Sequence, residues 1–566
     1  SKWVAYDKKG LNRLNSIYLY SLESGKSYAI TGPMTDDRSP VFDPEGRYLY
    51  FLSNRDIKPF MDVFDAAYIL KDITKIYAVT LTKDEPSPFE PESDEEEPEA
   101  EESKDKDKSD KEKGGDGDRK DGKKEFRIDI DGIEHRIVAF PIGSGSYGRL
   151  KANAENIFFL STPAEPLGGW GKAEKRSVLR RFNLKDRKLE TVISGIEGYD
   201  LSANGKKILY FAKNAIGIID AGVKGKRAGE GKLDLSSLEM YLNPPEEWRQ
   251  IFFEAWRLER DFFYDPNMHG IDWKRIRDRY AKLLPYVSNR EDLNYLLGEM
   301  VGELSCSHTY VWGGDRFYAP SPSVGLLGAD FELDRRSGRY RLARIYPPDE
   351  WNLNNGSPLV RPGLDVKEGD YILAVNGQQL KAPDNPYRLF QETVGRQVRL
   401  TVSSSPDGKD ARDVVVVPIS DDTSLRYRAW VNANRRRVYE ATGGKIGYIH
   451  IPDMSADGLK EFTRGFIAQT DKEGMIIDVR YNSGGFASEM ILEKLRRELV
   501  GMFSSRNGMD YTYPWRVIHG PMVCIVNEYS GSDGDIFPYF FRKYGLGKIV
   551  GKRTWGGVVG IRLSKM

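Results

Sequence analysis

The feature that most constrains the fold is an internal repeat within the first 240 residues. The segment 39–53, SPVFDPEGRYLYFLS, returns at 199–212 as YDLSANGKKILYFA, and more loosely at 149–161. A second strand-turn-strand pattern occurs at 17–30 and again at 179–192. Self-similar four-strand units of roughly 40–50 residues are typical of β-propeller blades. The repeat therefore predicts about four propeller blades in this region.

The predicted blades are few for a closed ring. Residues 1–6 fit the second strand of the earliest blade, and the chain opens with Ser1 where an initiator Met would stand. We therefore expect the chain to be a piece of a longer polypeptide, with further blades encoded upstream.

Residues 84–124 interrupt the blades with a run made almost wholly of Glu, Asp, Lys, Ser, Gly and Pro. Such a composition buries too little apolar surface to offset the entropy of ordering the chain. We predict a disordered surface loop at this position. The alternative is a charged docking segment.

The hydrophobic period changes after residue 240. From residue 245 onward apolar and aromatic side chains recur at helical spacing, and the same pattern continues over 273–284 and 290–304. The pattern predicts a small helical domain at 241–316. Its aromatic stripe is most simply explained as packing within the core of that domain.

Residues 317–420 carry the pattern of a further module. The run 363–380, GLDVKEGDYILAVNGQQL, precedes a helix-like segment at 385–394 and a final strand at 397–403. This pattern resembles a PDZ domain, in which a peptide adds as an extra strand with its carboxylate on a loop of free N–H groups. Residues 323–329, SVGLLGA, stand where that loop would be. Such a module either binds a peptide or braces its neighbours.

The last region, 421–566, alternates strand-like with helical runs. Strands are predicted at 446–451, 474–479 and 522–526, and helices at 456–470, 487–500 and 535–544. This alternation predicts an α/β domain with largely parallel central strands. The predicted fold class is thus multidomain, with a partial β-propeller at 1–240, a small helical domain, a PDZ domain and an α/β domain.

Composition argues against several classes of function. Lys plus Arg and Asp plus Glu both total 85, so the net charge of zero creates no field that favours nucleic acid or an anionic membrane. Cys306 and Cys524 are the only cysteines, which argues against a disulfide scaffold or a thiolate zinc site and suits a reducing compartment. No apolar run approaches the roughly 20 residues of a membrane span. We expect a soluble, cytoplasmic protein that uses no metal or cofactor.

The first candidate for chemistry is the turn 527–535, NEYSGSDGD, between a predicted buried strand and a helix. A serine on a strand-to-helix turn is exposed by the sharp backbone, and we expect Gly531 and Gly534 to permit the unusual dihedrals. The helix N-terminus also offers free N–H groups to a developing oxyanion. Ser532 is therefore a candidate nucleophile, although Gly-Ser-Asp-Gly is also an ordinary helix-capping turn.

Two other segments complete an acyl-transfer site. Residues 478–485, DVRYNSGG, end another predicted strand with a glycine pair whose N–H groups can line the same crevice. Residues 303–310, ELSCSHTY, place Ser307 and His308 at the end of the helical domain. A serine hydrolase without a lysine base needs a histidine, and the chain has five, at 135, 269, 308, 450 and 519.

These segments and their order resemble the tricorn branch of the tail-specific peptidase family. That family runs from propeller to helical domain with a Ser-His pair, then PDZ domain, then an α/β domain with the nucleophile. The resemblance covers nearly the whole chain and implies that Ser532 is the nucleophile and His308 its base, with Ser307 orienting His308. It further implies that the backbone N–H groups of Gly485 and Asp533 form the oxyanion hole.

The resemblance also distinguishes two kinds of base. Carboxyl-terminal processing peptidases of the wider family use a Ser/Lys dyad, with the lysine after Thr-aromatic-Gly. Residues 551–558 read GKRTWGGV, so Gly557 occupies the place of the lysine, 25 residues after Ser532. A Ser/Lys mechanism is therefore disfavoured, and Lys552 and Arg553 are expected to be surface charges.

The resemblance implies a serine peptidase that hydrolyses oligopeptides by acyl-enzyme chemistry, downstream of a larger protease, as a homo-oligomer and specifically a hexamer. Its fourth catalytic residue is a glutamate well beyond the nucleophile. We expect that glutamate beyond Met566, which makes the α/β domain truncated at its C-terminus.

Three points stay open at this stage. Asp510 or Asp535 is a candidate for recognising basic substrate side chains. A noncatalytic scaffold that binds peptides through its PDZ and propeller surfaces is one alternative function. A Ser/Lys carboxyl-terminal processing peptidase is the other.

Overall fold

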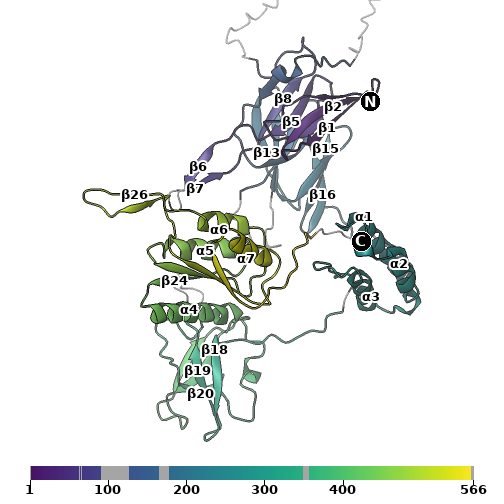
Figure 1. Cartoon of the computed structure of the whole chain (residues 1–566). Coiled ribbons are helices and arrows are strands. Elements are labelled where there is room, and N and C mark those ends of the chain that lie inside the picture. Colours follow the sequence, from purple (N-terminus) through teal and green to yellow (C-terminus); the bar gives the residue numbers. More distant parts are fainter. Residues whose placement is uncertain are drawn as a thin grey trace, which may run out of the picture. The chain divides into compact units, whose positions relative to one another are not determined.

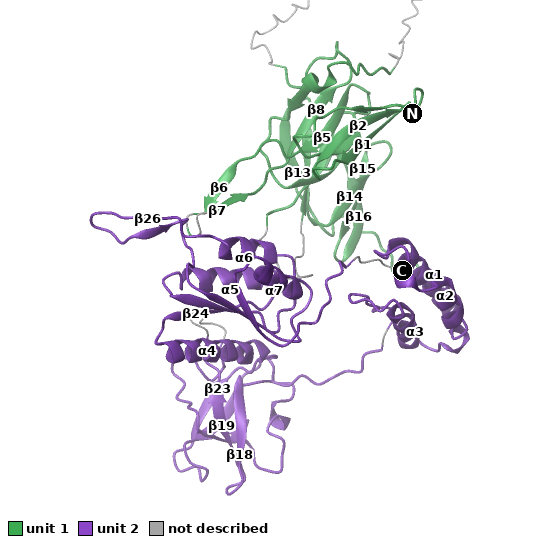
Figure 2. Cartoon of the chain, viewed as in Figure 1, with its two compact units in different colours: residues 1–240 green, residues 241–566 purple. Residues whose placement is uncertain are grey.

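The computed structural model describes residues 2–62, 64, 67–90, 126–164, 177–315, 317–348 and 356–561. The chain forms two compact units, residues 1–240 and 241–566 (Figure 2). The first unit is built of β-strands. The second contains three helices near its start, a mostly antiparallel sheet and an α/β domain, in that order along the chain (Figure 1).

The first unit contains successive antiparallel sheets. In its described part the strand orders are β1-β2-β3, β4-β5-β8-β9, β10-β11-β12-β13 and β14-β15-β16, with β17 added parallel to β13 and β6-β7 forming a separate hairpin. The strands are β1 (Trp3–Lys9), β2 (Asn15–Ser21), β3 (Ser27–Ala29), β4 (Asp37–Phe42), β5 (Tyr48–Ser53), β6 (Pro59–Asp62), β7 (Ala67–Leu70), β8 (Lys75–Thr80), β9 (Ile137–Ala139), β10 (Tyr147–Ala152), β11 (Asn156–Ser161), β12 (Ser177–Asn183), β13 (Lys188–Ile196), β14 (Gly198–Leu201), β15 (Lys207–Ala212), β16 (Ala215–Asp220) and β17 (Lys226–Arg227). The predicted propeller fold is confirmed, because the repeated sequences form the antiparallel pairs β4-β5, β10-β11 and β14-β15.

Successive sheets pack face to face through alternate side chains of one strand. In β5, Leu49 and Phe51 join a cluster with β2 and β8, whereas Tyr48 and Tyr50 join a cluster with β11 and β12. Successive residues of a strand point to opposite faces, so a strand buried on both faces is apolar throughout. All six residues of β5 are buried. This double burial explains why the sequence of β5 is an almost continuous apolar run.

The charged insert begins later than predicted. Residues 84–90 have a defined structure: Phe89 packs edge-on against Phe140, with ring centroids 4.9 Å apart, and the Pro86 carbonyl accepts a hydrogen bond from the Tyr48 hydroxyl at 3.1 Å. The prediction of disorder from residue 84 is wrong for these residues, because Phe89 buries enough apolar surface to anchor them. The rest of the predicted loop, 91–124, lies outside the described residues.

The second unit begins with helices α1 (Pro244–Phe262), α2 (Trp273–Ala281) and α3 (Arg290–Gly302). Asp272 and Asn289 cap α2 and α3 by accepting backbone N–H bonds at 3.0 and 2.9 Å. The aromatic stripe is core, as predicted: Trp256 and Trp273 are buried and each donates its indole N–H to the carbonyl of the other, at 2.8 and 3.0 Å.

The PDZ-like module is a sheet of order β18-β19-β20-β22-β23, with β21 paired to β20. Its strands are β18 (Ala329–Asp334), β19 (Arg339–Ile345), β20 (Tyr371–Val375), β21 (Gln378–Gln379), β22 (Val398–Ser403) and β23 (Arg412–Val416). The helix predicted at 385–394 is wrong, because only a single 3-10 turn forms, at Arg388–Phe390.

The expected carboxylate-binding loop of this module is also largely wrong. The Ser323 N–H donates to the Glu392 carboxylate at 2.8 Å, and the N–H groups of Gly325 and Leu326 donate to carbonyls of Phe390 and Ile419, both at 2.8 Å. These three N–H groups are therefore already used within the module, which leaves fewer donors for a peptide carboxylate than the resemblance implied.

The α/β domain has the predicted parallel sheet, of order β24-β25-β28-β29. Its elements are α4 (Thr423–Thr442), β24 (Ile446–His450), α5 (Ala456–Ile467), β25 (Gly474–Asp478), α6 (Ser488–Leu495), β26 (Gly501–Phe503), β27 (Tyr511–Tyr513), β28 (Met522–Val526), α7 (Asp533–Lys543) and β29 (Gly547–Gly551). Helices α5, α6 and α7 share one apolar core with the sheet, and α4 lies on its other face (Figure 1). Helix α4, the β26-β27 hairpin and β29 were not predicted.

Candidate active site

Ser532 stands where β28 gives way to α7, at the N-cap of the helix. Its backbone is strained, with φ 58° and ψ −120°, a conformation that non-glycine residues rarely adopt. The expectation that Gly531 and Gly534 carry the unusual dihedrals is wrong, because neither has a positive φ. They are needed for space: a side chain on Gly531 would start 3.1 Å from the Trp555 ring, and one on Gly534 would start 2.8 Å from Asn482.

The turn after β25 lies directly against Ser532. A Cβ placed on Gly484 would be 2.6 Å from the Ser532 Cβ and 3.1 Å from the Asp533 nitrogen, so no side chain fits there. The buried Asn482 fixes this contact: its carbonyl accepts the Gly531 N–H at 3.0 Å, and its side-chain oxygen accepts the Gly484 N–H at 2.9 Å. The two glycine-bearing turns predicted from sequence are therefore brought together at the carboxyl ends of parallel strands.

The two predicted oxyanion donors lie on these adjoining turns. Among the residues that the structure describes, no acceptor is hydrogen-bonded to the N–H of Gly485 or of Asp533. Gly485 has φ 150°, and a side chain there would start 2.0 Å from the Met454 carbonyl oxygen. The Asp533 carboxylate points away from this role, because it is buried and accepts the backbone N–H of Ser488, at 3.0 Å, at the start of α6. Only its backbone is free to act at Ser532.

One ring nitrogen of His308 has a hydrogen-bond partner, and the other has none among the described residues. Its Nδ1 lies 2.8 Å from the Tyr310 hydroxyl, whereas its Nε2 is buried and has no hydrogen-bond partner among the described residues. His308 itself has φ 63°, and positive φ also occurs at two other non-glycine residues of the site motifs, Ser305 and Tyr481. In the tautomer whose Nδ1–H donates to Tyr310, Nε2 is an acceptor, which is the state a general base requires.

The other histidines are poorly suited to be the base. His450 is buried between Tyr427 and Asp478, and burial lowers the pKa of His450 to about 4. His269 uses both ring nitrogens, on the Tyr264 hydroxyl and the Leu304 carbonyl. His135 and His519 are exposed, and His135 lies in the first unit. His308 is the one that contacts the segment following Ser532.

Residues 553–557, which we call the bridging segment, join the two halves of the site. The Trp555 ring meets the His308 ring edge-on, with centroids 5.1 Å apart at 76°, and a Cβ on Gly557 would be 2.7 Å from the Ser307 Oγ. The described residues include no hydrogen bond between His308 and Ser532, so the contact between them runs through Trp555. Within the same residues Ser307 forms no hydrogen bond to His308 either; Tyr310 does.

The position of the family's lysine is structurally closed to a lysine. Gly557 is buried, and the space beside its Cα is taken by Ser307 and by the Trp555 ring, which would lie 2.4 Å from a Cβ at this position. Lys552 is a surface charge as predicted: its side chain is 76% exposed and pairs with Glu528 at 2.9 Å. Arg553 is exposed as well.

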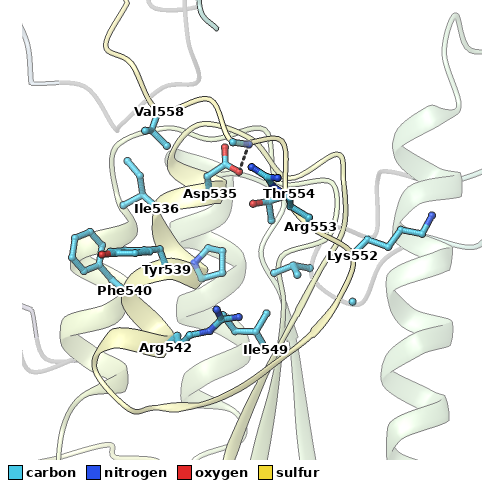
Figure 3. Close-up of a pocket in the computed structure, with 14 residues that line it drawn as sticks. Asp535, Ile536, Tyr539, Phe540, Arg542, Ile549, Lys552, Arg553, Thr554 and Val558 are labelled. Carbon is cyan, nitrogen blue, oxygen red and sulfur yellow. Dashed lines mark hydrogen bonds between the residues drawn. The ribbon is translucent and has the colours of Figure 1, made fainter. Parts of the chain in front are cut away.

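The two specificity candidates lie in different surroundings. Asp510 is exposed in the hairpin between β26 and β27. Asp535 is 9% exposed; its Oδ1 accepts the Gly556 N–H at 2.8 Å, and its Oδ2 is buried without a partner among the described residues. Asp535 lines a cavity of about 680 Å³ between α7 and the segment after β29, together with apolar side chains such as Ile536 and Tyr539 (Figure 3).

Sequence reasoning missed several neighbours of the site. Asn482, Tyr310 and Trp555 were each inside a quoted motif without being given a role. Glu259 of α1 lines a cavity of about 190 Å³ with Ser307 and His308, and burial raises the pKa of Glu259. A polar residue inside a glycine-rich turn was an available signal for Asn482. Nothing in the sequence singled out Glu259, because it lies in a helix whose apolar spacing indicates only packing in the core.

The described residues contain no group of three or more His, Cys, Asp and Glu side chains placed to hold a metal ion. None of the described helices is long and apolar enough to cross a membrane.

Comparison with known proteins gives matches along nearly the whole chain. Four family models match in succession: the Tricorn protease second beta propeller domain over 1–222, the Tricorn protease C1 domain over 244–302, the Tricorn protease PDZ domain over 325–421 and Peptidase family S41 over 445–566.

Individual relatives agree with these models. A tricorn protease homolog of Saccharolobus solfataricus is 36% identical over 576 residues, which cover 99% of this chain and 50% of the relative. The tricorn protease of Thermoplasma acidophilum is 33% identical over 551 residues, 97% of this chain and 48% of the relative. A crystal structure of the tricorn protease matches with a TM-score of 0.84 and 31% identity, covering 100% of this chain and 53% of that one.

The chain thus spans about half the length of the relatives it matches. Propeller, helical, PDZ and peptidase models follow one another in the order predicted from the sequence. The chain belongs to the tricorn branch of the tail-specific serine peptidase family.

Proposed function

We propose that the chain is the peptidase-bearing part of a tricorn-like enzyme that hydrolyses oligopeptides through an acyl-enzyme. The observation that carries the proposal is the contact between two turns: the strained Ser532 lies against Gly484, and the N–H groups of the adjoining residues Gly485 and Asp533 have no acceptor among the described residues. A nucleophile beside two preorganised donors is the arrangement that acyl transfer requires.

In the proposed mechanism, His308 Nε2 accepts the proton of the Ser532 hydroxyl while Oγ attacks the peptide carbonyl carbon. The Gly485 and Asp533 N–H groups donate to the oxyanion of the tetrahedral intermediate. The protonated Nε2 then gives its proton to the leaving nitrogen, and the C–N bond breaks to leave an acyl ester on Ser532. Water, deprotonated by Nε2, hydrolyses this ester and restores the serine.

The His308 environment fits this sequence of proton transfers. In this proposal the Tyr310 hydroxyl accepts from Nδ1–H, which selects the tautomer whose Nε2 is basic. Closer approach of His308 to Ser532 in the complex with substrate is expected, because catalytic hydrogen bonds are often long in free enzymes. Ser307 as an orienting residue, and a glutamate beyond Met566 as the fourth member, stay predictions from the family resemblance.

Labelling with a fluorophosphonate tests the proposal and separates it from the scaffold alternative. We expect the folded full chain to form a covalent adduct, located at Ser532 by mass spectrometry of the proteolysed protein. The same chain unfolded in urea is the matched control and should not react, because the hydroxyl is activated only by the folded site. A folded chain that stays unlabelled supports a noncatalytic peptide-binding scaffold and contradicts the proposal.

Recognition of basic side chains by Asp510 or Asp535 stays a prediction, and the cavity in Figure 3 supports Asp535. Its Oδ2 is buried and has no hydrogen-bond partner among the described residues, so a guanidinium or ammonium group that enters beside the apolar wall would supply the missing donor. If Asp535 has this role, D535N should lower kcat/KM for arginine-containing peptides by about tenfold relative to leucine-containing ones, with D510N unchanged. The reverse pattern assigns recognition to Asp510, and no change in either variant rejects both.

The oligomeric state of the enzyme, its cellular location and the source of its substrates are also proposals. The family resemblance supports a homo-oligomer, specifically a hexamer, which sedimentation of the full chain measures directly as a mass. Cys306 and Cys524 are free thiols, which agrees with the proposed cytoplasmic location. Trimming of peptides released by a larger protease rests on the resemblance alone.

A further inference from the structure

The bridging segment, residues 553–557, is attached to the nucleophile turn at two points. The Trp555 N–H donates to the Ser530 carbonyl at 2.9 Å, two residues before the nucleophile. The Gly556 N–H donates to Asp535 Oδ1 at 2.8 Å, and the Asp535 N–H in turn donates to the Ser532 carbonyl at 2.8 Å. The segment is thus fixed to the first turn of α7 by bonds on both sides of Ser532.

The same segment contacts the base. Trp555 packs its ring against the His308 imidazole, and the ring also lies against Gly531, whose missing side chain makes room for it. Gly557 lies against Ser307. One aromatic side chain therefore touches both the nucleophile turn and the base, which are 224 residues apart in the chain.

We propose that Trp555 is a positioning residue that sets the His308 imidazole relative to Ser532, with Asp535 holding the Trp555 backbone in place. The proposal rests on the proposed peptidase function. In the described residues the imidazole is fixed by Tyr310 at Nδ1 and by the Trp555 ring, while Nε2 makes no hydrogen bond. Without the Trp555 ring, the imidazole is free to rotate about Cα–Cβ and would reach the serine hydroxyl less often in the geometry that proton transfer needs.

Aromatic edge-to-face pairs have a defined geometry, so the ring fixes direction as well as filling space. Misplacing a catalytic group by about 1 Å can lower a rate by about 10²-fold. Trp555 touches neither the peptide carbonyl nor the exchanged proton in the mechanism above, so its removal should act on the rate of bond formation and leave reagent binding nearly unchanged.

The test measures covalent modification of Ser532 by a neutral fluorophosphonate in the full chain, as kinact and KI. We expect W555A to lower kinact by about 10- to 100-fold with KI within about twofold. W555F, which keeps an aromatic ring, should stay within about threefold of the unmodified chain. W515A is the matched control, because Trp515 is also a partly exposed tryptophan of the α/β domain but lies beside the hairpin.

A second variant keeps the test informative if W555A is poorly folded. D535A removes the acceptor of the Gly556 N–H and should lower kinact by about tenfold. Circular dichroism and thermal unfolding establish that each variant is folded.

The inference is overturned if W555A and D535A both react at the rate of the unmodified chain, if W555F is as slow as W555A, or if W515A is equally slow. Each of those outcomes leaves the proposed function in place, because Ser532 would still react. An unmodified chain that does not react at all contradicts the proposed function itself.

Discussion

Replacing Ser532 with alanine should lower peptide hydrolysis by about 10⁶-fold, to the level left by binding alone. The fold should be unaffected, because the strained φ of 58° is set by the surrounding turns and the hydroxyl caps no backbone N–H of α7. Hydrolysis of a fluorogenic oligopeptide by the full chain, or by the longer protein that contains it, measures the loss.

Ser483 supplies the control for this substitution. It lies in the adjoining turn next to Gly484, is exposed, and has no role in the proposed chemistry. S483A should keep hydrolysis within about twofold of the unmodified rate, since exposed substitutions seldom have large effects. Retained hydrolysis in S532A would remove Ser532 from the mechanism.

Replacing His308 with alanine should lower kcat by about 10²- to 10⁴-fold, which is the usual contribution of a general base. KM should change little, because His308 acts on the serine proton and is not expected to bind the peptide. Steady-state hydrolysis over pH 6 to 9 measures both constants.

The matched variants in this experiment are K552A and H519A. Lys552 pairs with Glu528 at the surface, and His519 is exposed before β28, so both should behave like the unmodified chain. A K552A variant that loses activity, together with an active H308A, would establish a lysine-based mechanism of the carboxyl-terminal processing type in place of the proposed one.

Much of the fold could be predicted because buried strands are visible in the sequence as runs of apolar residues. Strands β5 and β11 are buried on both faces, so they read as apolar runs within a visible repeat. The central strand β28 was predicted at its observed bounds, Met522–Val526, for the same reason.

Elements that bury little were missed. Helix α4 has only Leu425 and Val431 buried over twenty residues, and its run of arginines and asparagines lacks a clear apolar face. The β26-β27 hairpin has mostly exposed side chains, so it left no alternating pattern. The short 3-10 turn at Arg388–Phe390 was read as a full helix because local spacing cannot report how far a helix continues.

The candidate site likewise contains residues that the sequence pattern indicates and one residue that it does not. Ser532, Gly485 and Asp533 lie on turns that follow buried strands, and parallel strands bring such turns to one edge. His308 could be named only through family resemblance. Its contact with Trp555 depends on how the helical segment packs onto the α/β domain, and no local pattern encodes that packing.

The route from His308 through Trp555 to Ser532 also has a consequence for how the protein is made. Domains fold largely in order during synthesis, at about 5–20 residues per second. The helical segment and PDZ-like module can therefore be complete while residues 553–557 are still inside the ribosome. Until that segment docks, His308 lacks its contact with the Trp555 ring, so we expect the nascent chain to be inert toward the unfolded peptides that surround it at the ribosome.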